Sequence, residues 1–130
     1  MKIKGIDNKT YSWSLNNYVP DEDSTRSRSE LHLKVRQLLK DRYPLDRILE
    51  EVPLPSTRLL LDFFIPTRKI GVECQGEQHY KQINHFHKDK MGFINSQKRD
   101  KVKQEWCDLN NIRLIVVRFD ETEEEIKEKL

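Results

Sequence analysis

Residues 58–75 read RLLLDFFIPTRKIGVECQ, and this stretch decides the fold. Two mainly apolar runs of strand length, residues 58–65 and residues 70–75, flank the four residues PTRK. Runs rich in β-branched and aromatic residues are typical of strands, and a short turn between two of them predicts a hairpin. We therefore expect two antiparallel strands joined by a turn at residues 66–69.

The predicted hairpin brings two acids together. With that turn, residue 65 pairs with residue 70 and residue 64 with residue 71, so Asp62 lies directly opposite Glu73. Cross-strand partners have Cβ atoms roughly 5 Å apart, and two carboxylates at that distance repel each other. A hard divalent cation such as Mg²⁺ would remove the repulsion. The alternative is a pair of buried acids neutralised by Arg58, Lys103 or Arg113.

The flanking sequence supplies the remaining elements. Residues 10–15 alternate with period two and predict an edge strand, and apolar residues at helical spacing predict a helix over residues 27–42 that Tyr43-Pro44 ends. We further expect a strand at 48–54, a polar loop at 76–92, a helix at 93–109, a strand at 112–119 and an acidic C-terminal helix. This order predicts an α/β (α+β) fold with a mixed central β-sheet flanked by helices.

Length and composition exclude several classes of protein. A chain of 130 residues with 35% hydrophobic residues allows one domain with a small core. No apolar run approaches the roughly 18 residues that span a bilayer, the first residues lack the apolar segment of a secretory signal, and two cysteines make no disulfide framework. We therefore expect a cytoplasmic protein without a membrane segment, in the bacterial host cell if a phage encodes it.

Charge is distributed unevenly along the chain. Residues 120–130 carry six acids and two lysines, whereas residues 81–104 carry seven lysines or arginines and two aspartates. We divide the chain into an N-terminal arm (1–23), a core domain (24–119) and an acidic helix or tail (120–130). A basic body suits a protein that contacts the phosphate backbone of a nucleic acid, most directly through residues 81–104. The alternative is a solvated, lysine-rich face.

Several short motifs in this order resemble the PD-(D/E)XK nuclease superfamily. They are Asp62, the segment Glu73-Cys74-Gln75, and a preceding helix that carries Glu30. The following Gly76-Glu77-Gln78-His79-Tyr80 is similar to the very-short-patch-repair-like and phage homing-endonuclease (EDxHD-type) branches. In those branches a later helix carries an R-D-x-x-K segment, matched here by residues 99–103, and a strand follows. The resemblance covers residues 27–119 and implies a restriction-endonuclease-like core.

The resemblance also implies an activity, namely metal-dependent hydrolysis of DNA phosphodiester bonds by an endonuclease that a phage or mobile element encodes for homing, repair or recombination. Asp62 and Glu73 would hold Mg²⁺, or Mn²⁺ in its place, with the backbone carbonyl of Cys74 as a further ligand. Gln75 would position the attacking water, and His79 would act as general base or acid. The remaining candidate site residues are Glu30, Gln78 and Lys103. A homodimer would account for cutting of both strands.

The sequence departs from the family pattern at two positions. Leu61 stands where proline is common, and Gln75 stands where the family has a lysine. Glutamine cannot carry the positive charge that lysine would use, so Lys103, Lys98 or His79 would have to supply it. A catalytically inactive nucleic-acid-binding module with the same fold is therefore the alternative function. A protein-interaction domain, in which the acids serve folding alone, is a third.

Individual motifs also have structural interpretations. Ser27 and Glu30 fit a capping box at the start of the first helix, and Asp100 and Lys103 fit a surface ion pair. Trp13 and Trp106 are expected to pack in the core and not to stack on bases. We expect His85, His87, Lys88 and Lys90 to lie in a loop that contacts phosphates. A zinc site is the alternative for the histidines and cysteines, which are His79, His85, His87, Cys74 and Cys107.

Overall fold

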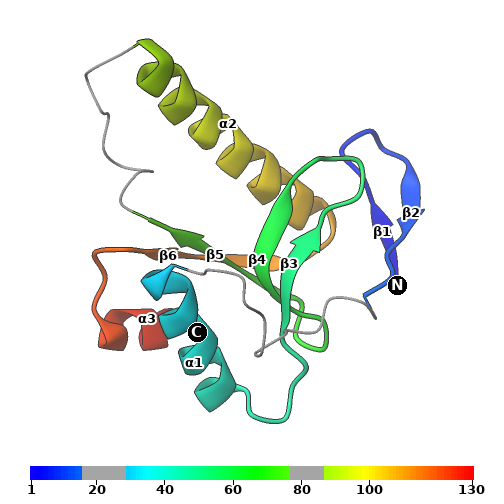
Figure 1. Ribbon diagram of the computed structural model, residues 1–130. Coiled ribbons are helices and arrows are strands. Elements are labelled where there is room, and N and C mark those ends of the chain that lie inside the picture. Colours follow the sequence, from blue (N-terminus) through cyan, green and yellow to red (C-terminus); the bar gives the residue numbers. More distant parts are fainter. Residues whose placement is uncertain (16–28, 77–86) are drawn as a thin grey trace.

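The computed structural model describes residues 1–15, 29–76 and 87–130, and for residues 87–96 it gives the backbone alone. Its elements in chain order are β1 (Lys2–Lys4), β2 (Thr10–Ser12), α1 (Glu30–Arg42), β3 (Leu49–Pro53), β4 (Leu60–Ile65), β5 (Ile70–Gln75), α2 (His87–Leu109), β6 (Arg113–Arg118) and α3 (Glu123–Lys129). This is the mixed α/β architecture that the sequence predicts (Figure 1). None of the described helices is long and apolar enough to cross a membrane.

The central sheet has the strand order β3-β4-β5-β6. Strands β3, β4 and β5 are antiparallel neighbours, whereas β5 and β6 are parallel. Parallel neighbours require a crossover, and α2 provides it. In the β4–β5 hairpin Phe63 pairs with Val72 and Ile65 pairs with Ile70, so the predicted turn and register are confirmed.

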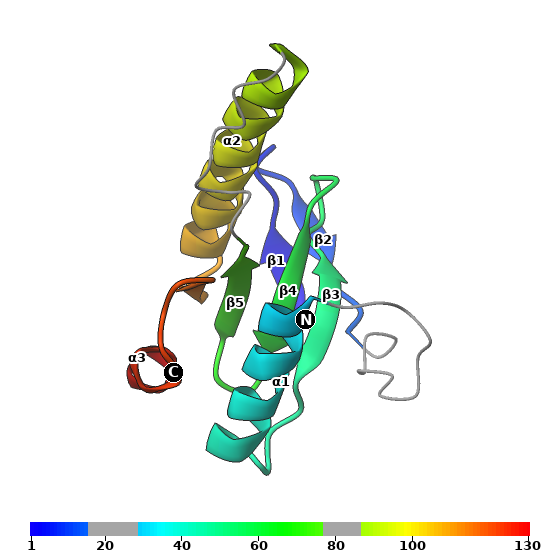
Figure 2. The same ribbon diagram turned by 60° about the vertical axis from the view of Figure 1, so that its left-hand side comes forward.

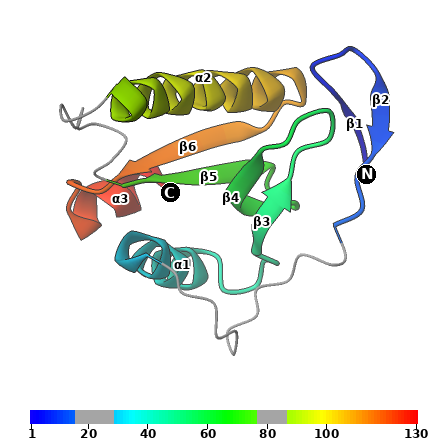
Figure 3. The ribbon, with the colours of Figure 1, turned by 45° about the horizontal axis from the view of Figure 1, so that its top comes forward.

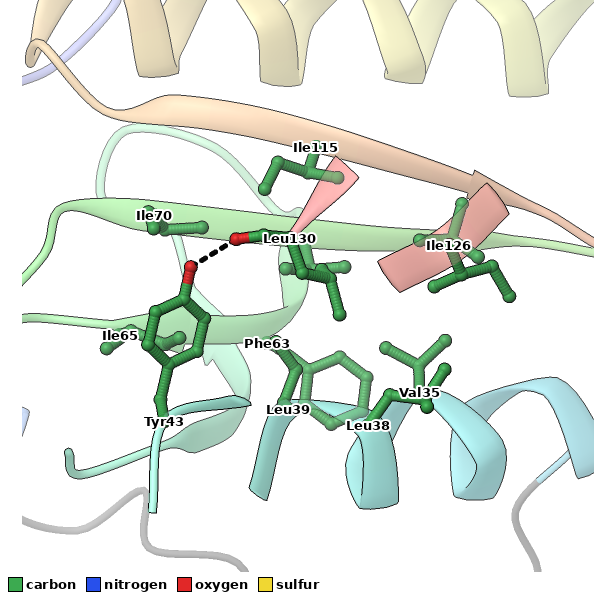
Figure 4. Packing of buried hydrophobic residues seen from close by; sticks show 12 residues of the cluster. Val35, Leu38, Leu39, Tyr43, Phe63, Ile65, Ile70, Ile115, Ile126 and Leu130 are labelled. Carbon is green, nitrogen blue, oxygen red and sulfur yellow. Dashed lines mark hydrogen bonds between the residues drawn. The ribbon is translucent and has the colours of Figure 1, made fainter. Parts of the chain in front are cut away.

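Helices cover both faces of this sheet. Figure 3 shows α2 along one face, with α1 and α3 on the other, and Figure 2 shows α1 lying along the strands. The core between α1, α3 and the sheet includes Val35, Leu39, Phe63, Val72 and Ile126 (Figure 4). The Tyr43 hydroxyl donates a hydrogen bond to the backbone oxygen of Leu130, which ties the end of α1 to the end of α3. The acidic C-terminal segment is thus a helix that packs into the core.

A second core lies between α2, the sheet and the N-terminal hairpin β1–β2. The ring of Trp13 lies 4.8 Å from that of Phe64 and 5.1 Å from that of Trp106, measured between centroids. Both indole N–H groups donate to backbone carbonyls, Trp13 to Pro53 and Trp106 to Pro55. The prediction that both tryptophans serve packing is therefore confirmed.

Two predicted helix starts are wrong. Helix α1 begins at Glu30, and its N-cap is Ser29, whose hydroxyl accepts a hydrogen bond from the backbone N–H of His32. Glu30 is therefore the first residue of α1, and Ser29 occupies the N-cap position predicted for Ser27, which lies outside the described residues. Either serine suits an N-cap, so the residue type alone does not tell them apart.

Helix α2 begins at His87, whereas the sequence predicts a start at Phe93. The predicted loop at 76–92 therefore ends sooner, and His87, Lys88 and Lys90 lie in the first turns of α2. Lysine has a good helix propensity, and the single Gly92 costs only about 1 kcal/mol in a helix interior. Residues 77–86, which include His85, lie outside the described residues.

A buried polar cluster joins α1 to β3. Glu50 is 6% exposed and accepts hydrogen bonds from Arg36 at 2.8 and 2.9 Å, and it also contacts the ring nitrogen of His32. The His32 ring stacks on Phe63 with centroids 4.4 Å apart. Burial alone would raise the pKa of Glu50, but the hydrogen bonds from His32 and Arg36 outweigh it and lower the pKa to about 2. Glu50 is thus a buried carboxylate whose charge depends on two partners from α1.

Candidate active site

The candidate site lies where the two strands of the β4–β5 hairpin stop pairing. The described ladder runs from Ile65 and Ile70 to Phe63 and Val72. Beyond Phe63 and Val72, carboxylate side chains accept the hydrogen bonds of backbone N–H groups. The Cys74 N–H donates to Asp62 Oδ2 at 2.8 Å, and the Asp62 N–H donates to Glu73 Oε1 at 3.3 Å. Asp62 and Glu73 are therefore neighbours across the hairpin, as the predicted register requires.

Glu73 is the more deeply buried of the two acids, with 6% of its surface exposed. Burial raises the pKa of Glu73, the nearby charge of Asp62 raises it further, and Lys103 opposes both, which leaves a pKa of about 8. The Lys103 Nζ atom, which comes from α2, lies 2.9 Å from Glu73 Oε2. The carboxyl group of Glu73 therefore needs a positive charge in addition to that of Lys103 to be fully ionised at neutral pH.

A pocket of about 370 Å³ opens beside the two acids. Its lining combines three cations with three carboxyl groups and two leucines; the residues are Arg58, Leu59, Leu60, Asp62, Glu73, Cys74, Arg99, Asp100 and Lys103. Arg58 reaches the pocket from the connection that precedes β4, and four-residue spacing on α2 places Arg99 beside Lys103. From the sequence, Arg58 is predicted only as a candidate partner of the buried acids and Arg99 has no role of its own, although the helical spacing of Arg99 and Lys103 is visible there.

Gln75 and Asp100 form a second link between β5 and α2. The Gln75 Nε2 atom donates to Asp100 Oδ2 at 3.1 Å. Asp100 and Lys103 thus both reach across to β5, Asp100 to Gln75 and Lys103 to Glu73, so they are more than a surface ion pair. The amide of Gln75 is therefore held by a carboxylate from α2.

The structure does not bring every candidate residue to the pocket. Glu30 is exposed at the start of α1 and does not line the pocket. Gln78 and His79 lie outside the described residues. Asp62, Glu73, Cys74 and Lys103 line the pocket, and Gln75 contacts its wall through Asp100.

The two cysteines lie on opposite faces of the sheet. Cys74 packs against the core beneath α1, whereas Cys107 belongs to the core beneath α2. Burial raises the pKa of both thiols far above neutral pH. Because the two thiols belong to cores on opposite faces of the sheet, they do not form a shared zinc site.

The acids of the pocket provide oxygen donors of the kind that Mg²⁺ prefers. Mg²⁺ is usually bound through one or two carboxylates while it keeps several waters. Asp62 and Glu73 supply two adjacent carboxylates, and their mutual repulsion would be relieved by a cation. The described part of the chain contains no group of three or more His, Cys, Asp or Glu residues placed to hold a metal ion. The donor set therefore fits a weakly held, hydrated divalent cation.

Comparisons with known proteins return viral relatives without a stated activity. Uncharacterized protein 307L of Invertebrate iridescent virus 6 is 38% identical over 125 residues, which cover 82% of this chain and 64% of the relative. Uncharacterized protein 033L of Invertebrate iridescent virus 3 is 39% identical over 67 residues, which cover 52% of this chain and 34% of the relative. This chain thus spans less than two thirds of the length of these relatives. No family model and no solved structure matches the sequence.

Proposed function

We propose that this protein is a metal-dependent DNA endonuclease with a restriction-endonuclease-like core of the PD-(D/E)XK type. The observation that carries the proposal is the pair of adjacent carboxylates, Asp62 and Glu73, with Lys103 beside them in an open pocket. A carboxyl group that is buried beside a second acid costs stability and is more typical of a functional site than of a structural one.

The arrangement of the elements supports the same proposal. From α1 onward the order is helix, three antiparallel strands, crossover helix and parallel strand. The resemblance implies a core of this kind, with the acids on the central hairpin and the R-D-x-x-K segment on the following helix. The virus-encoded relatives support a role in a virus or a mobile element, such as homing, repair or recombination.

Each polar residue of the pocket has a role in this proposal. Asp62 and Glu73 would hold Mg²⁺ or Mn²⁺, and such an ion supplies activation of water and neutralisation of charge on the phosphate. Arg58 and Arg99 line the pocket and would bind the DNA phosphate. Asp100 fixes the amide of Gln75 on β5.

The PD-(D/E)XK superfamily has a lysine at the position of Gln75. We assign the role of that positive charge to Lys103. Its ammonium group already contacts Glu73, so a helix residue delivers the charge that a strand residue would otherwise provide. Lys103→Met, which keeps the length of the side chain but removes its charge, is expected to lower the rate of cleavage by about 10²-fold, the size typical of losing one charge-stabilising group.

The measurement is single-turnover cleavage of a labelled duplex over a range of Mg²⁺ concentrations. Because Lys103 lowers the pKa of Glu73, the variant should also need more Mg²⁺ for half-maximal rate, whereas a purely structural lysine would leave that requirement unchanged. Lys34→Met, at an exposed position of α1 on the other face of the sheet, is the matched control. An equal rate in the Lys103 and Lys34 variants would contradict the assignment.

The proposed activity is tested directly with supercoiled plasmid and a branched DNA in Mg²⁺, Mn²⁺ or EDTA. Nicking is expected with either metal and not with EDTA, and Glu73→Ala should abolish it. The alternative of an inactive DNA-binding module is favoured by Gln75, which replaces the lysine of the family. Binding of both DNAs that is independent of metal and is retained in Glu73→Ala, with no cleavage, would support that alternative.

A further inference from the structure

We propose that the N-terminal hairpin, residues 2–12, is a docking surface for the phosphate backbone of duplex DNA beside the candidate site. This inference rests on the proposed function, because it takes DNA as the partner. It adds a contact surface that lies outside the basic stretch at residues 81–104, where the sequence predicts the backbone contacts.

The hairpin is held firmly against the body of the protein. Lys4 and Asn110 form a reciprocal pair, in which the Lys4 N–H donates to Asn110 Oδ1 at 2.7 Å and Asn110 Nδ2 donates to the Lys4 carbonyl at 2.8 Å. On the other side, the Ile6 N–H donates to Ser56 Oγ at 2.9 Å. Ile3 is 5% exposed and packs in the core beneath α2. A surface fixed at both sides loses little conformational entropy when it binds a partner.

The hairpin packs so closely around Gly5 that a residue with a side chain would not fit there without a shift of its neighbours. A Cβ atom at Gly5 would lie 2.6 Å from Ser56 Oγ and 2.6 Å from the ring of Tyr11. Glycine therefore lets the hairpin approach the β3–β4 connection, residues 54–59, at close range. The hairpin and this connection consequently form one continuous rigid surface.

The exposed side of the hairpin is basic. Lys2 and Lys4 are exposed and alternate with the buried Ile3 along β1, and Lys9 is exposed just before β2. The acid of the hairpin, Asp7, accepts hydrogen bonds from the Tyr11 hydroxyl and the Lys9 N–H. The hairpin thus carries three lysines and a single acid, which already accepts two hydrogen bonds. Such a surface can bind a polyanion, because ammonium groups bind phosphates without regard to base sequence.

The hairpin contacts the same connection that lines the pocket. Ser56, which binds the hairpin, and Arg58, which lines the pocket, belong to the same β3–β4 connection. Figures 1 and 3 place the hairpin beside this connection, at the end of α2 where Asn110 follows. A duplex with one phosphate in the pocket would therefore have neighbouring phosphates available for Lys2 and Lys4.

The test compares two double variants that each remove two positive charges. Lys2→Gln with Lys4→Gln changes the hairpin, and Lys34→Gln with Lys127→Gln changes α1 and α3, which lie on the opposite face of the sheet (Figure 3). Binding of a short labelled duplex is measured by fluorescence anisotropy in EDTA over a series of salt concentrations. The hairpin variant should bind about tenfold more weakly near 0.1 M salt, and its plot of log affinity against log salt should lose up to about two units of slope.

The control variant should bind more tightly than the hairpin variant and keep the slope of the unmodified protein. Equal losses in the two variants, or no loss in the hairpin variant, would overturn the inference. Preference for a single strand over the duplex would also overturn it. If the unmodified protein binds duplex but cleaves no DNA with Mg²⁺ or Mn²⁺, weaker binding by the hairpin variant would uphold the docking surface while the nuclease proposal fails.

Discussion

Asp62→Asn is expected to make the protein more stable and at the same time to abolish metal-dependent cleavage. Asparagine keeps an oxygen that can accept the Cys74 N–H but removes the negative charge beside Glu73. At a pH above about 8, where Glu73 is ionised, relief of the repulsion should add on the order of 1 kcal/mol to the free energy of unfolding, which corresponds to about 4 °C in melting temperature for a domain of this size. Loss of a carboxylate ligand should lower cleavage on the order of 10³-fold or more.

Thermal melts with and without Mg²⁺ test both parts of this expectation. An ion that binds the folded state alone raises its stability, so Mg²⁺ should raise the melting temperature of the unmodified protein and not that of Asp62→Asn. Asp108→Asn removes an exposed acid of α2 and is the matched control, expected to behave like the unmodified protein. A lower melting temperature for Asp62→Asn with cleavage intact would show that the acids serve the fold alone.

Among the substitutions proposed for this protein, Glu50→Ala is expected to lower the free energy of unfolding the most. It removes the shared partner of His32 and Arg36 and leaves the guanidinium of Arg36 next to an apolar core without its carboxylate. Breaking one side of a buried ion pair typically costs 3–5 kcal/mol, which is a large part of the stability of a small domain. Urea unfolding at neutral pH measures the loss, and Glu105→Ala on the exposed side of α2 serves as the control.

The same cluster predicts how stability depends on pH. The pKa of Glu50 is about 2 in the folded protein, compared with 4.5 as its ordinary value. A carboxyl group with a lowered pKa stabilises the fold fully above its unfolded pKa, and this contribution disappears as the pH falls from about 4.5 toward 2. Its size is on the order of 3 kcal/mol. Glu50→Gln should flatten the decline in melting temperature across that window, and an unchanged decline would contradict the assignment.

The central hairpin could be predicted from the sequence because its determinants are local. A four-residue turn and the period of two fix which residues face each other, so the juxtaposition of Asp62 and Glu73 follows from residues 58–75 alone. The placement of Lys103 could be proposed, but its contact with Glu73 depends on how the crossover helix lies on the sheet. The orientation of α2 on the sheet is set by tertiary packing, and no pattern among neighbouring residues in the sequence indicates it.

The buried cluster around Glu50 could not be predicted for the same reason. In the sequence Glu50 is one of two glutamates in a short strand followed by prolines, which resembles an exposed edge. Its partners lie on α1, and only packing of that helix on the sheet makes the position internal. The sequence also places the start of α1 at Ser27, whereas Ser29 supplies the capping hydroxyl.

The crossover geometry of α2 has a consequence for the order of folding. The β4–β5 hairpin joins residues close in sequence and can form quickly, whereas Lys103 arrives only after the long connection from β5 has closed. During this interval the two acids face each other without their ammonium partner. A chain in which α2 has not yet packed on the sheet therefore holds Asp62 and Glu73 without Lys103, so the candidate site is complete only after this long-range contact has formed.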